Sequence, residues 1–405
     1  MYVGTLKAVA YRNPEKPLKT SHEAHILSPS LSLHAKLGPI ITLHFGSRPA
    51  IFIADRFLSH QALVQNGAIF ADRPPPLDGR EQVVITTAVY GPTWRVLGRN
   101  LTAEMLHSSR VKSYSYARKV VLERLLKLLK DQSDSADRWV EVTDQFRNSM
   151  FSLLAFMCFG KELEEQKIKE IAELQEKLRG LIVPLILDRK KLKQEKSNEG
   201  ENQDDNKHGI SFYVDTLLDV KLPEENRSLD VEEILGLCSE FLNGGTDNTS
   251  ALLQWIMANL VKNPHIQQKL FMEIKGVIGN EEKMVKEDDL HEMPYLKAVI
   301  LEGLRRHPPL RFLLHHAVTE DVVLDGYFMP RNGTMNFMIG DMGMDPKVWE
   351  DPMSFKPERF VMSAEDGEGF DITGSKEIKM MPFGARRRIC PTSSRVFCGE
   401  FGVEF

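Results

Sequence analysis

Two short apolar runs near the start of the chain, IITLHF and AIFIA, are separated by Gly46 to Pro49. This pattern predicts a small β-hairpin between Pro39 and Ala54. After about Ser115 the apolar residues recur instead at intervals of three and four, which predicts amphipathic helices. The recurring positions are Val120, Val121, Leu125, Leu128 and Leu129, followed by Phe151, Leu154, Ala155 and Cys158.

Two further helices have clear boundaries. Asp230, with Glu233 three residues later, is typical of a helix N-terminus, and the apolar pattern that follows continues to Asn263 and Pro264. A second helix is predicted from Pro294 to His307, because two prolines follow it.

The segment 189–209 contains almost no apolar residues and mixes both charge signs, which predicts a solvated loop, with an interaction tail as the alternative. In VVLDGYFM, Asp325 and Gly326 lie between β-branched and aromatic residues, which predicts a second hairpin. The fold class expected is therefore mainly α with small β sheets (α+β), the strands lying towards both ends of the chain.

Composition excludes some classes of function. Hydrophobic residues make up 42% of the 405 residues and charged residues 27%, as in an ordinary globular enzyme. The formal charge of -5 gives no electrostatic case for binding nucleic acid. The four cysteines do not form a disulfide pattern, and Cys158 and Cys238 lie in apolar helical patterns, so we expect both to be buried structural thiols. The N-terminal sequence has no apolar run long enough to cross a bilayer, so no anchor is expected in this chain.

A polar, glycine-containing stretch, LNGGTDNTS, interrupts the apolar turns of the long helix. Gly244 and Gly245 each destabilise a helix by about 1 kcal/mol relative to alanine, so the presence of both in one helix requires an explanation. One interpretation is a kink or close packing against a neighbour. The other is that a ligand approaches the backbone beside an acid, Asp247, and hydroxyls that relay protons.

Glu302 and Arg305 share one face of the helix before the double proline. Such pairs are mostly surface features worth less than about 1 kcal/mol. Here apolar residues surround the pair, which favours burial, and a buried arginine needs further acceptors. Downstream, Arg359 belongs to a second charged pair in an apolar setting, PERF.

Cys390 follows three arginines in MPFGARRRICP. A positive field lowers the pKa of a thiol and favours the thiolate, which binds metals or attacks electrophiles. A basic nuclear-localisation patch is the alternative. Cys398 lies eight residues later without a second pair of ligands, so a zinc site is not expected.

Six segments, in this order and spacing, resemble the haem-thiolate monooxygenases of the cytochrome P-450 superfamily, and the plant members of family 89 type in particular. The segments are GPTWRVLGRNL, FADRPPP, CSEFLNGGTDNTS, PYLKAVILEGLRRHPP, DPMSFKPERF and MPFGARRRIC. The resemblance implies a single cytochrome P-450 domain over 1–405, with a family-like region at 39–391 and an atypical tail at 392–405.

The resemblance also implies roles for individual residues. They are Cys390 as the axial iron ligand; Trp94, Arg95, His316 and Arg388 as contacts to the haem propionates; Asp247, Asn248 and Thr249 in proton delivery to dioxygen; and Glu302, Arg305 and Arg359 as a buried structural triad.

The implied function is that of a monooxygenase with haem b, which takes electrons from an NADPH-cytochrome reductase and inserts one oxygen atom of O2 into a small hydrophobic substrate. The implied location is the cytosolic face of the endoplasmic reticulum membrane, although the family's N-terminal membrane helix is not expected in this chain.

Several positions depart from the family pattern. Asn248 stands where the family has threonine, Gly98 where it has arginine, and Arg386 and Thr392 where it has glycine. The tail TSSRVFCGEFGVEF lacks helical periodicity, so we expect a fold without the C-terminal helix that follows Cys390 in the family. These departures support an alternative function, a non-catalytic truncated remnant with impaired haem binding. A third hypothesis, an interaction or nucleic-acid module built on the three arginines, lacks support from the net charge.

Overall fold

The computed structural model describes residues 7–9, 21–22, 34, 36–45, 48–76, 83–134, 140–161, 175–198, 210–279, 285–365 and 370–391. These residues form two compact units. The first contains the described residues up to 76 and those from Ala258 to Cys390, and the second contains 83 to Met257 together with Pro391. The tail 392–405 lies outside the described residues.

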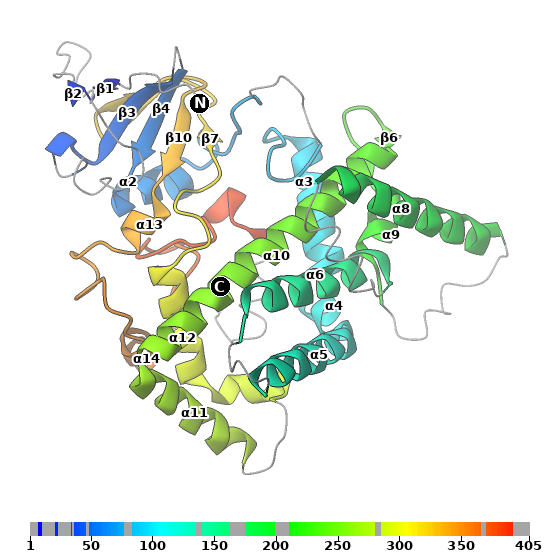
Figure 1. Ribbon diagram of the computed structural model, residues 1–405. Coiled ribbons are helices and arrows are strands. Elements are labelled where there is room, and N and C mark those ends of the chain that lie inside the picture. The colour runs from blue at the N-terminus through cyan, green and yellow to red at the C-terminus, as the bar shows by residue number, and fades with distance from the viewer. Residues whose placement is uncertain are drawn as a thin grey trace. The chain divides into compact units, whose positions relative to one another are not determined.

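A six-stranded sheet in the first unit has the order β2-β1-β3-β4-β10-β7 (Figure 1). Its strands are β1 Lys7–Val9, β2 Ser21–His22, β3 Ile40–Phe45, β4 Arg48–Ile53, β7 His316–Ala317 and β10 Thr334–Phe337. The antiparallel pair of β3 and β4 confirms the hairpin predicted for 39–54. β10 then pairs in parallel with β4, with Met335 opposite Ile51, so strands from both ends of the chain share one sheet.

The second predicted hairpin is also confirmed. β8 (Val322–Leu324) and β9 (Tyr327–Met329) pair antiparallel around a two-residue turn. Asp325 and Gly326 have φ values of 49° and 81°, the left-handed conformation that such a tight hairpin turn needs at both central positions.

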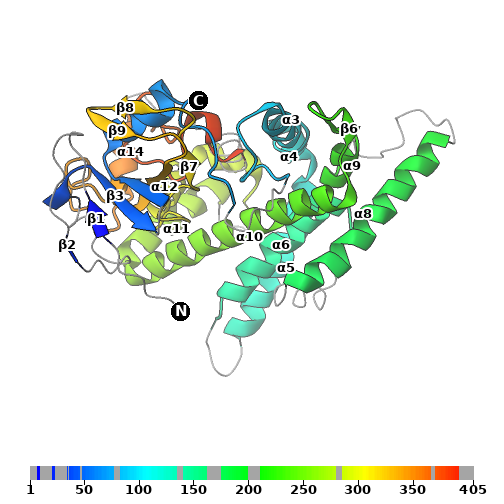
Figure 2. The ribbon, with the colours of Figure 1, turned by 90° about the horizontal axis from the view of Figure 1, so that it is seen from above.

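The helices of the first unit are α2 Arg56–His60, the π-helix η1 Gln61–Gln65, α11 Pro264–Ile278, the 3-10 helix η3 Glu287–Glu292, α12 Pro294–Arg306, α13 Ile339–Met342, α14 Glu358–Glu365 and the 3-10 helix η4 Arg386–Arg388. Of these, α2, η1 and α13 pack into a core that includes the buried faces of β4 and β10. The helix predicted from Pro294 to His307 is thus confirmed as α12. Figure 2 shows α12 beside α14, and their contact brings two distant charged motifs together.

The second unit is mainly helical. Its elements are α3 Pro92–Asn100, the π-helix η2 Leu101–Met105, α4 Ser108–Ser113, α5 Ser115–Ser133, α6 Thr143–Phe159, α8 Gln175–Asn198, α9 Tyr213–Leu218, β5 Lys221–Leu222, β6 Arg227–Ser228 and α10 Val231–Lys262, the last of which continues into the first unit. In the predicted N-terminal motif of α10, Asp230 and Glu233 each accept the other's backbone N–H at 2.8 Å. None of the helices in the described part of the chain is both long and apolar enough to span a bilayer.

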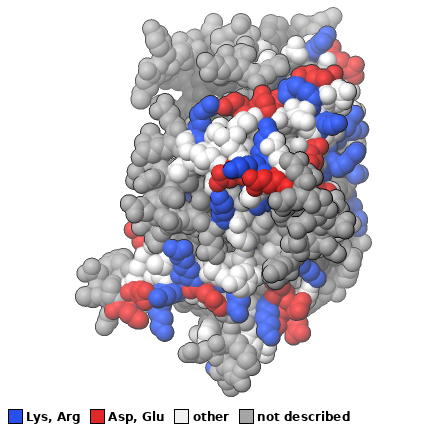
Figure 3. All heavy atoms as spheres, turned by 90° about the vertical axis from the view of Figure 1, so that its right-hand side faces the viewer, with Lys and Arg blue, Asp and Glu red and all other residues white. Residues whose placement is uncertain are grey.

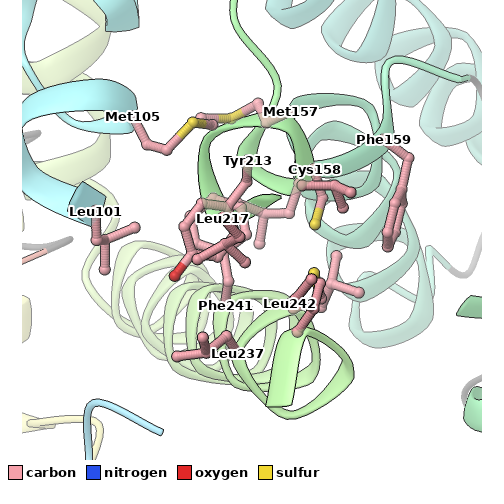
Figure 4. Close-up of a cluster of buried hydrophobic side chains, with 14 of the residues drawn as sticks. Leu101, Met105, Met157, Cys158, Phe159, Tyr213, Leu217, Leu237, Phe241 and Leu242 are labelled. Carbon is pink, nitrogen blue, oxygen red and sulfur yellow. The ribbon is translucent and has the colours of Figure 1, made fainter. Parts of the chain in front are cut away.

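The core of the second unit packs α6, α9, α10 and η2 together (Figure 4). Cys158 on α6 and Cys238 on α10 are fully buried in this core as free thiols, which confirms the prediction for both. Burial raises the pKa of the Cys158 thiol well above its ordinary value, and a hydrogen bond with Cys238 adds to this effect. The Cys158 thiol therefore stays protonated, and both buried side chains serve packing.

The prediction of a loop at 189–209 is wrong for the first part of this segment, because α8 continues to Asn198. Tertiary ion pairing explains the difference: the Arg189 guanidinium forms two hydrogen bonds with the carboxylate of Asp215 at the start of α9. Basic and acidic side chains are interspersed on the face drawn in Figure 3, as expected for solvated helix surfaces. The rest of the segment, 199–209, lies outside the described residues.

Candidate functional site

Cys390 ends a tight loop of the first unit. Its backbone N–H donates to the carbonyl of Phe383 at 2.8 Å, and the backbone N–H of Ile389 donates to the carbonyl of Arg386 at 3.1 Å. Cys390 itself is half-buried, whereas Cys158 and Cys238 are fully buried. Among the cysteines that the structure describes, Cys390 is therefore the one that is partly exposed.

Two residues of this loop adopt left-handed backbone conformations. Gly384 has a φ of 80° and Arg386 a φ of 52°. Glycine adopts this region without steric cost, whereas another L-residue pays about 1–2 kcal/mol. The position at which the family pattern has glycine is thus one where the backbone favours glycine, and Arg386 strains it.

Two arginines, one of them within this loop, bind backbone carbonyls near it. The Nε of Arg388 donates to the carbonyl of Ala71 at 2.7 Å. Nη1 of Arg73 donates to the carbonyls of Leu314 and His315, both at 2.8 Å. Arg73 was missed in the sequence, although the motif FADRPPP contains it. Together the two guanidinium groups supply the cationic donors that carboxylates require.

His316 lies next to these arginines but is buried in the sheet, with its ring edge-on to Phe337. Burial, then the charges of Arg73 and Arg388, lower the pKa of His316 to about 3, so the ring is neutral near pH 7. Its Nδ1 lies 2.6 Å from the carbonyl of Phe70 and must carry the proton, which leaves Nε2 as an acceptor. The geometry favours the two arginines over His316 as partners of a carboxylate.

The structure brings Glu302, Arg305 and Arg359 together. Arg305 binds the Glu302 carboxylate in a bidentate manner, with Nε 2.7 Å from Oε2 and Nη2 2.8 Å from Oε1. The Nε of Arg359 lies 3.3 Å from the same Oε2. Glu302 and Arg305 are almost completely buried, so the charges are compensated where water cannot reach them.

Neighbouring groups complete the environment of this triad. Arg305 also donates to the carbonyls of Gly343 at 2.6 Å and Pro352 at 3.0 Å. The ring of Trp349 lies under both guanidinium groups, 5.4 Å from that of Arg305 and 6.0 Å from that of Arg359. The further acceptors that a buried arginine needs are therefore present.

In the second unit, Trp94 and Arg95 lie on α3 and both contact Tyr90. The rings of Tyr90 and Trp94 are 5.2 Å apart, and the Arg95 guanidinium lies 5.1 Å from the centre of the Tyr90 ring. The carboxylate of Glu224 caps the start of α3 by accepting from the backbone and the hydroxyl of Thr93. The two predicted haem contacts are therefore held as one group with Tyr90.

The surroundings of the two glycines in the α10 stretch differ, so the same explanation does not serve for both. A Cβ on Gly245 would lie 2.7 Å from Cδ1 of Leu154 on α6, so close packing accounts for this glycine. A Cβ on Gly244 would meet nothing within 4 Å. Packing within the described chain therefore does not explain Gly244, and the approach of a ligand stays a prediction for it.

The polar residues that follow point in different directions. Asp247 is exposed and pairs with Arg147 of α6, with Oδ1 3.1 Å from Nε. Asn248 donates its side-chain N–H to the carbonyl of Gly244 at 3.0 Å. Thr249 is half-buried, while the hydroxyl of Thr246 is buried without a hydrogen-bond partner in the described structure. This unsatisfied hydroxyl is a polar feature of α10 that the sequence did not single out.

No group of three or more histidine, cysteine, aspartate or glutamate side chains within the described ranges is arranged to hold a metal ion. An iron bound by the single thiol of Cys390 would need its other ligands from a non-protein group, as the nitrogens of a porphyrin supply them. The partly exposed Cys390 and the nearby guanidinium groups of Arg73 and Arg388 fit the iron and the carboxylates of such a group.

A family model described as Cytochrome P-450 matches residues 18–182 and 167–391. The chain belongs to the cytochrome P-450 family. It is 46% identical to Cytochrome P-450 89A9 of Arabidopsis thaliana over 89% of this chain and 77% of that protein, which confirms the predicted likeness to plant members of family 89 type.

Other relatives agree with this assignment. The chain is 30% identical to Cytochrome P-450 71A1 of Persea americana (89% of this chain, 77% of that protein) and 27% identical to Isoflavone 2'-hydroxylase of Medicago truncatula (89% and 76%). A solved zebrafish cytochrome P-450 structure with abiraterone has a TM-score of 0.70 at 19% identity, covering 92% of this chain and 87% of that one. The mainly helical cytochrome P-450 fold is confirmed.

Membership establishes the general chemistry. Cytochrome P-450 proteins are monooxygenases that contain haem iron and use dioxygen, an organic substrate and a redox partner. The predicted enzyme class and iron cofactor are confirmed at this level.

Proposed function

We propose that this chain inserts one atom of dioxygen into a small hydrophobic substrate, with haem b as cofactor and electrons from an NADPH-cytochrome reductase. The observation that carries the proposal is the partly exposed Cys390, in a loop closed by its own backbone hydrogen bonds. When bound, haem would supply the dioxygen chemistry, and the thiolate of Cys390 would hold its iron.

The residues of the chain hold the cofactor in this proposal. Cys390 would ligate the iron, and Arg388 and Arg73 would donate to haem carboxylates. Trp94 and Arg95 are assigned to the same cofactor as further contacts. His316 acts indirectly, because its Nδ1–H holds the carbonyl of Phe70 next to the segment that carries Arg73.

Proton delivery is assigned to Asp247, Asn248 and Thr249. The carboxylate of Asp247 is exposed to water, and its ion pair with Arg147 orients it. Asn248 offers an amide in place of a hydroxyl, and its N–H is bonded to Gly244. Proton transfer is thereby altered, because an amide orients water but does not itself pass on a proton as a hydroxyl does.

An apolar substrate is supported by the segment that joins α12 to β7. Leu313 packs 3.6 Å from the position of a Cβ on Gly384, so this segment lies against the cysteine loop. Leu310 and Leu314 on either side of it are exposed apolar side chains. The relative from Medicago truncatula is named for hydroxylating an isoflavone, which also supports an organic substrate.

We further propose that the chain works as one cytochrome P-450 domain at the cytosolic face of the endoplasmic reticulum. Family membership supports this location. Fractionation of plant cells that express the tagged chain tests it, and recovery outside the microsomal fraction would contradict it.

The decisive experiment is to reconstitute the 405-residue chain with haem, reduce it and add carbon monoxide. A strongly red-shifted Soret band is expected for the wild type and should be absent in Cys390→Ser, because serine cannot supply a thiolate. A Cys390→Ser variant that keeps the shifted band, or a wild type that binds no haem, would refute the proposal.

A second candidate, a chain that folds but binds haem poorly, is favoured by one observation. The left-handed φ of 52° at Arg386 strains the loop that carries Cys390. If this alternative holds, the wild type takes up little haem and Arg386→Gly restores uptake. Full haem uptake by the wild type would exclude it.

A further inference from the structure

Glu240 of α10 binds two successive backbone amides of a distant segment. Its Oε2 accepts from the N–H of Ile85 at 2.8 Å and its Oε1 from the N–H of Thr86 at 2.6 Å. Both oxygens of one carboxylate are therefore used to hold backbone that has no helix or strand of its own. Hydrogen bonds to a charged acceptor are about twice as strong as neutral ones.

The same segment contacts α10 one turn earlier as well. A Cβ on Gly236 would lie 3.1 Å from Cγ1 of Val84, so Val84 packs closely onto the helix backbone at this glycine. Gly236 and Glu240 are four residues apart and lie on one face of α10. The segment is thus held at two consecutive turns, by packing at one and by the carboxylate at the other.

This segment leads directly into the predicted haem contacts. After Thr86 the chain forms a turn in which the N–H of Ala88 donates to the carbonyl of Val84 at 2.9 Å. Tyr90 follows, and its ring contacts both Trp94 and Arg95. Only a few residues separate the amides that Glu240 holds from this group.

We propose that Glu240 is a positioning residue for the cofactor: by holding Ile85 and Thr86 it sets the place of Tyr90, and through Tyr90 the orientation of Trp94 and Arg95. The inference rests on the proposed function, because it assigns Trp94 and Arg95 to the haem. Substitution by glutamine keeps the shape of the side chain but turns one acceptor into an NH2 group. That group faces a backbone N–H, so one of the two hydrogen bonds is lost.

The chain contains a matched control. Glu273 of α11 accepts from the N–H of Tyr295 at 2.7 Å and from that of Leu296 at 2.8 Å, at the start of α12. The chemistry is the same as at Glu240, but neither amide leads to a residue assigned to the cofactor. Glu273→Gln therefore reports the cost of losing such a contact without a change in cofactor binding.

The test compares Glu240→Gln, Glu273→Gln and the wild type as full chains. Hydrogen exchange followed by mass spectrometry, without haem, should show roughly tenfold faster exchange at Ile85 and Thr86 in Glu240→Gln only, equivalent to about 1.4 kcal/mol of lost protection. Titration with haem should show affinity weakened by roughly tenfold in Glu240→Gln and unchanged in Glu273→Gln.

The outcomes distinguish the positioning role of Glu240 from the proposed function of the chain. Faster exchange in Glu240→Gln with unchanged haem affinity would overturn the positioning role and leave the proposed function intact. Equal weakening in both variants would also overturn it, because general loss of stability would then be the cause. A wild-type chain that takes up no haem would refute the proposed function, and the positioning role with it.

Discussion

The left-handed backbone at Arg386 predicts how Arg386→Gly changes the free energy of unfolding, and the neighbouring Arg387 provides a comparison. Arg386 has a left-handed φ of 52°, whereas Arg387 does not have a positive φ. Both side chains are exposed and both belong to η4. Replacing either arginine by glycine removes one positive charge and one long side chain from the same loop, but only the change at Arg386 relieves a left-handed backbone conformation.

The expected magnitude follows from two opposing effects. Relief of the left-handed conformation at Arg386 stabilises the fold by about 1–2 kcal/mol. Glycine also makes the unfolded chain more flexible, which costs about 0.5–1 kcal/mol at either position. Arg386→Gly should therefore be neutral or stabilising by up to about 1.5 kcal/mol, while Arg387→Gly should destabilise. Strain at Arg386 contributes about 1–2 kcal/mol to the difference between the variants.

The assay is denaturant unfolding of the haem-free chains, with the free energy of unfolding compared between variants under identical conditions. The two arginines share similar exposure, so effects of salt on their charges should largely cancel. If Arg386→Gly destabilises the chain as much as Arg387→Gly does, the backbone at Arg386 is not strained. The reasoning about the cysteine loop would then be wrong.

Three other predictions concern stability. Glu302→Gln leaves a buried guanidinium without its counter-charge and should cost about 3–5 kcal/mol, whereas Glu123→Gln, in an exposed ion pair, should cost under about 0.5 kcal/mol in the same denaturant assay. The folded-state pKa of His316 is lowered from 6.5 to about 3, so the unfolded chain binds the extra proton first and the free energy of unfolding falls as pH drops below 6.5. His316→Gln should therefore reduce the slope of the free energy of unfolding against pH by up to about 1.4 kcal/mol per pH unit. An unchanged slope would contradict the burial of a neutral ring. Gly244→Ala should raise the thermal midpoint, since alanine favours a helix by about 1 kcal/mol. Gly245→Ala should not raise it, because the added methyl group meets a leucine of α6. Equal midpoints for the two variants would contradict the assigned packing.

Local patterns were sufficient for many elements. The capping pair at Asp230 and the turn at Asp325 and Gly326 depend on residues within three positions of one another, and the structure confirms both. The pairing of Glu302 with Arg305 follows from helical spacing in the same way. Such features are encoded locally, because backbone periodicity and short hydrogen bonds need no distant partner.

Other features of the site depend on distant partners. Arg73 joins Arg388 only because the segment around Ala71 lies against the cysteine loop, and no local pattern marks Arg73 as a donor. The charged stretch after Arg189 lacks an apolar pattern, yet it continues α8 because Asp215 binds the guanidinium there. In both cases the deciding contact comes from a part of the chain that is far away in sequence.

Helices α10 and α12, the two hairpins, the buried thiols and the choice of Cys390 as the candidate iron ligand therefore follow from the sequence. The pairing of β10 with β4, the burial of His316 as a neutral ring and the strain at Arg386 depend on the folded chain. The reason is physical: propensity and periodicity act over a few residues, whereas burial, pKa and strained backbone angles are set by whatever the rest of the fold packs against them.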